Sequence, residues 1–161
     1  MNKEGTDTGN KAARIISVNT SSSKGERKKP VEEGELRPEH GIVGDGHAGK
    51  WHRQVSLLAI ESIGKMVDKG LDVGPGDFAE NLTTEGIDLP HLPVGTRLRL
   101  GPALAEVTQI GKECHDRCAI YRQAGDCVMP REGIFVRVLE GGTVRAEDHI
   151  VMAGDYPSAV K

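Results

Sequence analysis

The chain has 161 residues, of which 37% are apolar and 28% charged, and this balance is typical of a single globular domain. A net charge of −3 and only five aromatic residues argue against a nucleic-acid-binding protein, which usually has a basic excess and clustered rings. No apolar run approaches the roughly 20 residues of a membrane span, and residues 1–11 lack a signal-peptide core. We therefore expect a cytoplasmic protein without nucleic-acid or membrane partners.

Taken in chain order, short apolar runs predict strands separated by turns rich in glycine and proline. The expected strands lie at 12–18, 54–60, 95–100, 103–110, 134–139 and 143–152, with a further one within 78–84. Residues 19–29 are rich in serine and lysine and predict a solvated loop, and residues 30–49 predict a glycine-punctuated loop. Gly141 and Gly142 predict a two-residue hairpin turn.

Two short helices are expected among these strands. Ile63, Met66 and Val67 recur at helical spacing within 61–69, and Gly70 follows as a stop. The second helix is expected at 114–122. Because strands dominate and no βαβ rhythm is evident, we predict a mostly β fold, a closed or nearly closed β-barrel with one or two short helices. This domain would span 12–153, between a disordered polar tail at 1–11 and a C-terminal tail at 154–161.

The densest group of reactive side chains lies in residues 111–131, which contain all three cysteines, Cys114, Cys118 and Cys127. An odd number of cysteines in a reducing compartment favours thiols over a disulfide framework. Their spacing lacks the CxxC pairs that are typical of structural zinc. Cys118 and Cys127 precede apolar residues, so packing in the core is the simpler interpretation for both.

Cys114 is the strongest candidate for chemistry. It stands at the expected start of a helix with Lys112, His115 and Arg117 nearby, and these surroundings favour a thiolate. A reactive thiolate would act as a metal ligand, a persulfide carrier or a nucleophile. The alternative, which the local residues leave open, is a buried thiol that acts as a small hydrophobic side chain.

A second cluster occupies residues 47–53 and combines imidazole, indole and cationic side chains; its members are His47, Lys50, Trp51, His52 and Arg53. Lys and Arg supply charge and Trp51 a planar ring, which together suit an anionic ligand. The alternative is a loop packed by Trp51 with its charges in solvent. The glycines of this region match no nucleotide-binding motif.

The sequence resembles the MOSC family, named for the C-terminal domain of molybdenum-cofactor sulfurases, and in particular its small stand-alone bacterial members. The resemblance lies in GIVGDGHAGKWHRQVSLLAIES (41–62), PGDFAENLTTEGIDLPHLPVGTRLRLG (75–101) and VTQIGKECHDRCAIYRQAGDCVMPREGIFVRVLEGG (107–142). It implies a β-barrel, and a key cysteine that ligates molybdenum or carries sulfur and corresponds to Cys114. One departure is Glu147-Asp148, where similar sequences usually have a Gly-Asp pair, and this puts the geometry of the last turn in question.

From the resemblance we expect binding of the molybdenum cofactor (molybdopterin), or sulfur carriage, in cofactor maturation or delivery. Cys114 would be the metal ligand or persulfide carrier, and charge type suggests supporting roles for ten residues. Lys112, His115 and Arg117 would favour the thiolate; Lys50, Arg53, Arg122 and Arg131 would hold the phosphate; Asp45, His47 and His52 would hydrogen-bond the pterin.

The expected partners are molybdenum-cofactor biosynthesis proteins or molybdoenzymes. A cysteine desulfurase is a further expected partner; pyridoxal phosphate would reside on that desulfurase, because no such domain fits in 161 residues. Two alternatives remain: a molybdenum-dependent reductase of N-hydroxylated compounds, and a non-catalytic β-barrel that serves as an interaction module.

Overall fold

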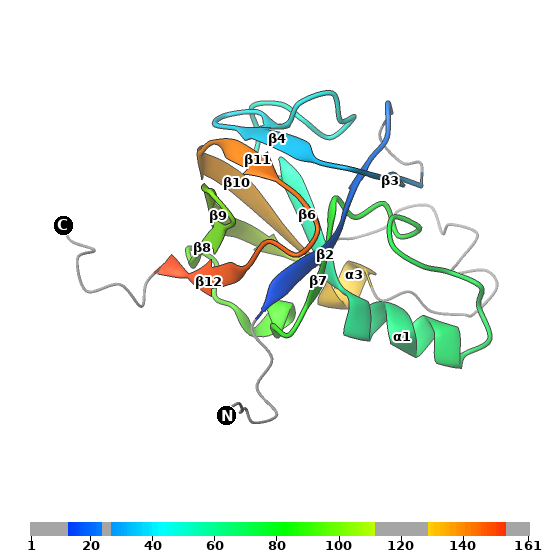
Figure 1. Cartoon of the computed structure of the whole chain (residues 1–161). Helices are drawn as coiled ribbons and strands as arrows, with labels where there is room; N and C mark the ends of the chain where they lie inside the picture. Colours follow the sequence, from blue (N-terminus) through cyan, green and yellow to red (C-terminus); the bar gives the residue numbers. More distant parts are fainter. Residues whose placement is uncertain (1–12, 24–26, 112–128, 154–161) are drawn as a thin grey trace, which may run out of the picture.

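The computed structural model describes residues 13–23, 27–111 and 129–153. The expected tails at 1–11 and 154–161 lie outside these residues, as does the expected helix at 114–122 with the three cysteines. Within the described residues the fold is mostly β, as predicted, with two sheets and two short α-helices (Figure 1).

The larger sheet has eight strands. In spatial order they are β12 (Ile150–Met152), β8 (Arg97–Leu100), β9 (Ala103–Ile110), β10 (Ile134–Glu140), β6 (Val55–Ala59), β7 (Leu82–Glu85), β2 (Arg14–Thr20) and β3 (Lys29–Val31). The smaller sheet has the order β11 (Gly142–Val144), β4 (Gly34–Arg37) and β5 (Gly41–Ile42). The helical elements are α1 (Ile60–Asp68), α3 (Met129–Glu132) and the 3₁₀ turn η1 (Leu89–His91).

The prediction of a closed or nearly closed barrel is confirmed only in part, because the fold is mostly β but the strand order does not return on itself. The free edge of β2 approaches the segment before β12 through a single bridge between Arg14 and His149. Ile15 donates to the carbonyl of Asp148 at 2.8 Å, and Ile150 donates to that of Ala13 at 2.9 Å. The remainder of that edge of β2 pairs with β3, so too little of it is left for a ladder with β12.

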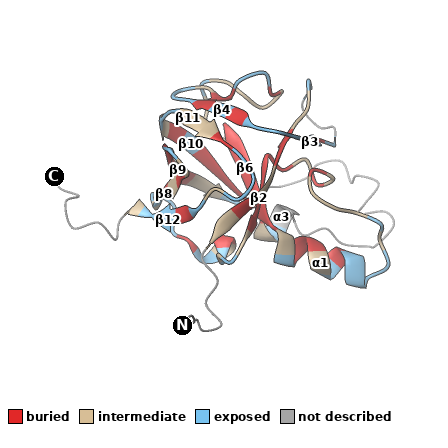
Figure 2. Ribbon diagram, in the orientation of Figure 1, coloured by how far each residue is buried: buried red, intermediate tan, exposed pale blue. Residues whose placement is uncertain are grey.

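The central strands contain a βαβ unit, although no βαβ rhythm was evident in the sequence. β6 and β7 run parallel, with Leu57 opposite Leu82, and α1 forms the crossover between them. Ile63 and Met66 of α1 are buried and pack with Leu58 in a cluster outside the main core. Figure 2 shows this buried stripe on α1 with exposed residues on its opposite side.

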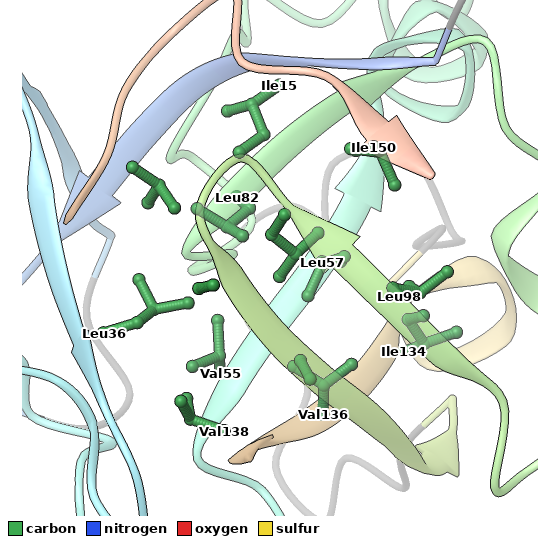
Figure 3. Close-up of a cluster of buried hydrophobic side chains, with 14 of the residues drawn as sticks. Ile15, Leu36, Val55, Leu57, Leu82, Leu98, Ile134, Val136, Val138 and Ile150 are labelled. Atoms are coloured by element: carbon green, nitrogen blue, oxygen red, sulfur yellow. The ribbon is translucent and has the colours of Figure 1, made fainter. Parts of the chain in front are cut away.

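The main core is enclosed by the two sheets. Figure 3 shows side chains from strands far apart in sequence meeting there, including Ile15, Leu36, Val55, Leu57, Leu82, Leu98, Ile134, Val136, Val138 and Ile150. All five residues of β6 are buried, since one face of the strand meets this core and the other meets α1 or polar partners. The predicted alternation in 95–100 is confirmed: Leu98 and Leu100 are fully buried, while Arg97 and Arg99 are not.

Two expectations about connections are wrong. The glycine-punctuated loop 30–49 contains β3, β4 and β5. Gly141 and Gly142 do not form a hairpin turn, because β10 pairs with β6 and β9, and β11 pairs with β4. A Cβ atom at Gly141 would lie 2.7 Å from the carbonyl oxygen of Leu36. These glycines therefore allow the chain to pass close to its neighbours as it crosses between sheets.

The last turn retains the backbone conformation that a glycine would favour. Glu147 has a φ of +79°, and the Asp148 side chain accepts a hydrogen bond from the Arg145 N–H at 2.9 Å. Arg14 pairs with the exposed Glu147 and the half-buried Glu85, so one guanidinium balances both carboxylates. Among the described residues, no helix has the length and apolar character needed to span a membrane.

A buried polar network joins β2, β6 and β7 at one end of the large sheet. Asn81 donates to the backbone of Asn19, and its side-chain oxygen accepts the Ser56 N–H at 3.0 Å. Glu80 is fully buried and accepts hydrogen bonds from the Gly76 N–H at 2.9 Å and the Thr83 hydroxyl at 2.6 Å. The Lys28 N–H donates to the Gly76 carbonyl at 2.8 Å and fixes this turn against the chain before β3.

We predict that Gly76→Ala lowers the free energy of unfolding by about 3 kcal/mol or more, because it combines backbone strain with overlap. Gly76 has a φ of +89°, and a Cβ atom would overlap the backbone carbonyl of Lys28. Gly70→Ala is the matched control, since Gly70 has a φ of +95° but open space around it, and it should cost about 1–2 kcal/mol. Urea denaturation measures both, and equal losses would contradict the overlap.

Candidate functional site

Residues 43–54 connect β5 to β6 and contain five of the predicted site residues; we call them the site loop. Backbone hydrogen bonds fix its course: Gly46 donates to Ser21 at 2.8 Å and Gly49 donates to His40 at 2.6 Å. Gly44 and Gly49 both have positive φ angles, of +87° and +155°. The glycine spacing noted in the sequence therefore corresponds to a loop that bends sharply.

Asp45 forms a buried ion pair beneath the site loop. Its Oδ1 lies 2.9 Å from Nζ of Lys28, and both side chains are 0% exposed. Lys28 also donates to the Ser21 hydroxyl at 2.9 Å. Asp45 further accepts the backbone N–H groups of Ser21 and His47 at 3.1 and 2.9 Å. The expectation that residues 19–29 are solvated is thus wrong for Lys28, which the carboxylate draws into the interior.

Burial by itself raises the pKa of Asp45, but the Lys28 ammonium and the two backbone N–H groups outweigh it and lower the pKa below its ordinary value. The group is therefore ionised, and its contacts all fix the loop. The role predicted for it, hydrogen bonding to a pterin, stays a prediction.

The aromatic rings of the site loop and the Arg53 guanidinium pack on one another. The His47 and Trp51 rings are nearly parallel, at 9°, with centroids 6.1 Å apart. The Arg53 guanidinium lies 5.4 Å from the centroid of Trp51 and 5.7 Å from that of Phe135 on β10. The indole N–H of Trp51 donates to the His47 carbonyl at 2.8 Å. Arg53 is thus held between two rings by cation–π attraction.

The Arg53 Nε atom is buried and has no hydrogen-bond partner among the described residues. A buried cationic donor without an acceptor is costly and is normally satisfied by an anion or water. Arg53 is therefore the predicted phosphate-binding residue whose surroundings best fit an anion. Lys50, by contrast, is 83% exposed and lies 4.0 Å from Glu39 at the surface.

His52 links the site loop to the end of β9. Its Nε2 atom lies 2.8 Å from Oε1 of Gln109, and Nε2 of Gln109 donates to the Gly111 carbonyl at 2.8 Å. The Thr108 hydroxyl contacts the carbonyls of His52 and Phe135. These contacts place the exposed His52 imidazole next to the last described residues before the cysteine segment.

The segment that contains Cys114 leaves and re-enters the fold at neighbouring points. Gly111 donates to the carbonyl of Gly133 at 2.6 Å, and Ile110 pairs with Ile134. α3 follows the segment, and its Glu132 accepts hydrogen bonds from Ser62 at 2.5 Å and Lys65 at 2.8 Å. Burial alone raises the pKa of Glu132, but these two donors outweigh it and lower the pKa. Arg131, a predicted site residue, is exposed on α3.

The structure brings together three of the predicted residues, His47, His52 and Arg53. Cys114, Lys112, His115, Arg117 and Arg122 lie outside the described residues. Over the described ranges, no three His, Cys, Asp or Glu side chains gather as a metal site. Sequence reasoning missed Lys28, Gln109 and Phe135, because a lysine in a serine-rich run, an amide and a strand phenylalanine show no local sign of these partners.

The model of the MOSC domain family matches residues 44–151, which is more than half of the chain. The chain belongs to the MOSC domain family. The MOSC match begins within the site loop and includes the cysteine segment, so both candidate regions lie inside it. A search of curated proteins finds no match.

Solved structures share the MOSC fold of this chain at low sequence identity. YuaD from Bacillus subtilis is 20% identical with a TM-score of 0.65, over 87% of this chain and 94% of that one. YiiM from Geobacillus stearothermophilus is 19% identical with a TM-score of 0.66, over 92% and 79%. YiiM from Escherichia coli is 23% identical with a TM-score of 0.64, over 88% and 69%. At these identities the likeness establishes the fold alone.

We predict that Asp45→Asn destabilises this MOSC domain by about 3 kcal/mol or more, because it leaves the Lys28 ammonium buried without its counter-charge. Glu35→Gln is the control, since it breaks an exposed pair with Arg37 and should change stability little. Chemical denaturation at pH 7 measures both. Similar effects from the two substitutions would contradict a structural role for the buried pair.

The difference in stability between the wild type and Asp45→Asn should also depend on pH. Because the pKa of Asp45 is lowered in the folded state, the unfolded chain binds its proton first as the pH falls from the ordinary value of about 3.9. The contribution of Asp45 is therefore complete above that value and is lost below it. Denaturation between pH 2.5 and 7 should show the two stabilities converging at the acid end, and a constant difference would contradict the lowered pKa.

Proposed function

We propose that this MOSC protein binds the molybdenum cofactor, or carries sulfur for it, through the thiol of Cys114 in cofactor maturation or delivery. The observation that carries the proposal is the placement of Arg53. This cation is held between two rings and linked, through its neighbour His52 and Gln109, to the point where the cysteine segment begins.

The chain connectivity favours one site that includes both Cys114 and the site loop. Cys114 is three residues beyond Gly111, and three extended residues span at most about 11 Å. Gly111 is fixed by its hydrogen bond to Gly133 and accepts one from Gln109. A soft thiolate attached at this point suits molybdenum or sulfane sulfur, and the cations of the site loop suit an anionic group.

The described residues fit the phosphate of such a cofactor. Arg53 offers a buried Nε donor without an acceptor among these residues, and Trp51 and Phe135 keep the guanidinium in place. When bound, the cofactor would supply a metal that accepts a sulfur ligand and changes oxidation state. His47 and His52 would provide hydrogen bonds beside it, and Lys50 and Arg131 would add positive charge from the surface.

Sulfur carriage would require a partner. A desulfurase that contains pyridoxal phosphate would present a cysteine persulfide, and the Cys114 thiolate would attack its outer sulfur. The new S–S bond forms on Cys114 as the partner's S–S bond breaks and its cysteine departs as a thiolate. A cysteine thiolate of a cofactor-biosynthesis protein or a molybdoenzyme would then attack the outer sulfur, so that the persulfide forms on the acceptor and Cys114 departs as a thiolate.

We predict that Cys114→Ser, purified from a host that makes the cofactor, contains at least tenfold less molybdenum or persulfide than the wild type. The persulfide is recognised by the added mass of one sulfur atom, about 32 Da. Arg53→Gln should reduce cofactor content about tenfold, since it removes a charge-assisted contact to phosphate. Arg97→Gln, at an exposed position of β8, is the control and should match the wild type. Native mass spectrometry and metal analysis provide the measurements.

Full molybdenum and sulfur content in Cys114→Ser would contradict the role of Cys114. If the wild type contained neither molybdenum nor a persulfide, the interaction module would be favoured. Turnover of an N-hydroxylated base by the loaded wild type, lost in Cys114→Ser, would instead favour the reductase.

A further inference from the structure

The hydrogen-bond chain at the end of β9 determines which nitrogen of His52 carries the proton. Nε2 of Gln109 lies 2.8 Å from the carbonyl oxygen of Gly111, an atom that can only accept. The amide nitrogen of Gln109 must therefore face Gly111, and its oxygen must face His52. That oxygen also only accepts, so the His52 Nε2 atom, 2.8 Å away, must be the donor.

We propose that Gln109 is a positioning residue that fixes His52 in the Nε2–H tautomer, and that His52 acts in the site as an acceptor through Nδ1. The neutral imidazole then presents a lone pair, and no N–H, to a molecule bound beside it. This suits a ligand group that carries an acidic N–H, O–H or S–H. It does not suit a direct contact to a phosphate, which needs a donor.

The division of roles between neighbouring residues follows from this geometry and rests on the function proposed above. The Arg53 guanidinium is held by its contacts to the rings of Trp51 and Phe135. Because it presents only hydrogen-bond donors, it selects the anionic part of a ligand. His52 selects a proton-bearing part of the ligand, whose N–H, O–H or S–H group donates a hydrogen bond to Nδ1. The Thr108 hydroxyl bonded to the His52 carbonyl holds the backbone, so that the ring stays against Gln109.

A second histidine, His91, provides an internal control, because its hydrogen bond favours the opposite tautomer. His91 is exposed, and its Nδ1 lies 2.7 Å from a carboxylate oxygen of Asp88. A carboxylate only accepts, so the neutral His91 ring carries its proton on Nδ1. The two histidines should therefore show opposite tautomers under one set of conditions.

Long-range ¹H–¹⁵N correlation spectra of the whole chain at pH 8 test the proposal without any cofactor. His52→Asn and His91→Asn assign the two rings by loss of their signals. We expect His52 to favour Nε2–H by at least about fivefold, the ratio for one net hydrogen bond, and His91 to favour Nδ1–H. A His52 ring protonated mainly on Nδ1 would overturn the proposal.

Two substitutions at position 109 give a second measurement. Gln109→Glu offers only acceptors and should keep the Nε2–H tautomer, whereas Gln109→Lys offers only donors and should move the proton to Nδ1. An unchanged tautomer in a folded Gln109→Lys protein would show that Gln109 does not position the ring. Absence of molybdenum and persulfide would refute the function proposed above while leaving this spectroscopic result intact.

Discussion

The ion pair between Lys28 and Asp45 is the constraint on which the site loop depends. Both side chains are removed from solvent, and a buried charge is tolerated only when it is paired and hydrogen-bonded. Any movement of the site loop away from the chain before β3 would separate these charges in a poorly solvating interior. Opening the loop is therefore energetically unfavourable. Because His47, Trp51 and Arg53 belong to the same loop, their positions are restrained as well.

The constraint extends from the ion pair into the large sheet. Lys28 donates its backbone N–H to Gly76, and Gly76 donates to the carboxylate of Glu80. Burial raises the pKa of Glu80 despite its hydrogen bonds from Gly76, Thr83 and Phe78, so its ionisation works against stability as the pH rises above the ordinary value. Asp45 acts in the opposite direction. The network therefore fixes the geometry of this end of the sheet, and Asn19 and Asn81 extend it to β2 and to the residues before β7.

The parts of the fold that depend on neighbours along the chain were predictable. The helix at 61–69, its stop at Gly70 and the alternation in 95–100 all appear, because side-chain periodicity and glycine conformation act locally. The errors concern partners far apart in sequence. A parallel ladder between β6 and β7 leaves no local pattern, and Gly141 looked like a turn glycine because the close carbonyl of Leu36 is more than 100 residues away.

The candidate site shows the same division between local and distant information. Clustered cations and rings predicted His47, His52 and Arg53 as site residues from residue type alone, and the structure brings these three together. Cys114, predicted from its neighbours and from the MOSC resemblance, lies outside the described residues. Residue type could not predict how these side chains are oriented. Phe135 on β10 contacts the Arg53 guanidinium, and Gln109 determines which nitrogen of the His52 ring is the acceptor. An amide in a strand suggests an ordinary surface position, yet its two ends differ chemically, and the Gly111 carbonyl decides which end faces the site. The chemistry of the loop is thus set by an uncharged residue 57 positions away from the imidazole that it orients.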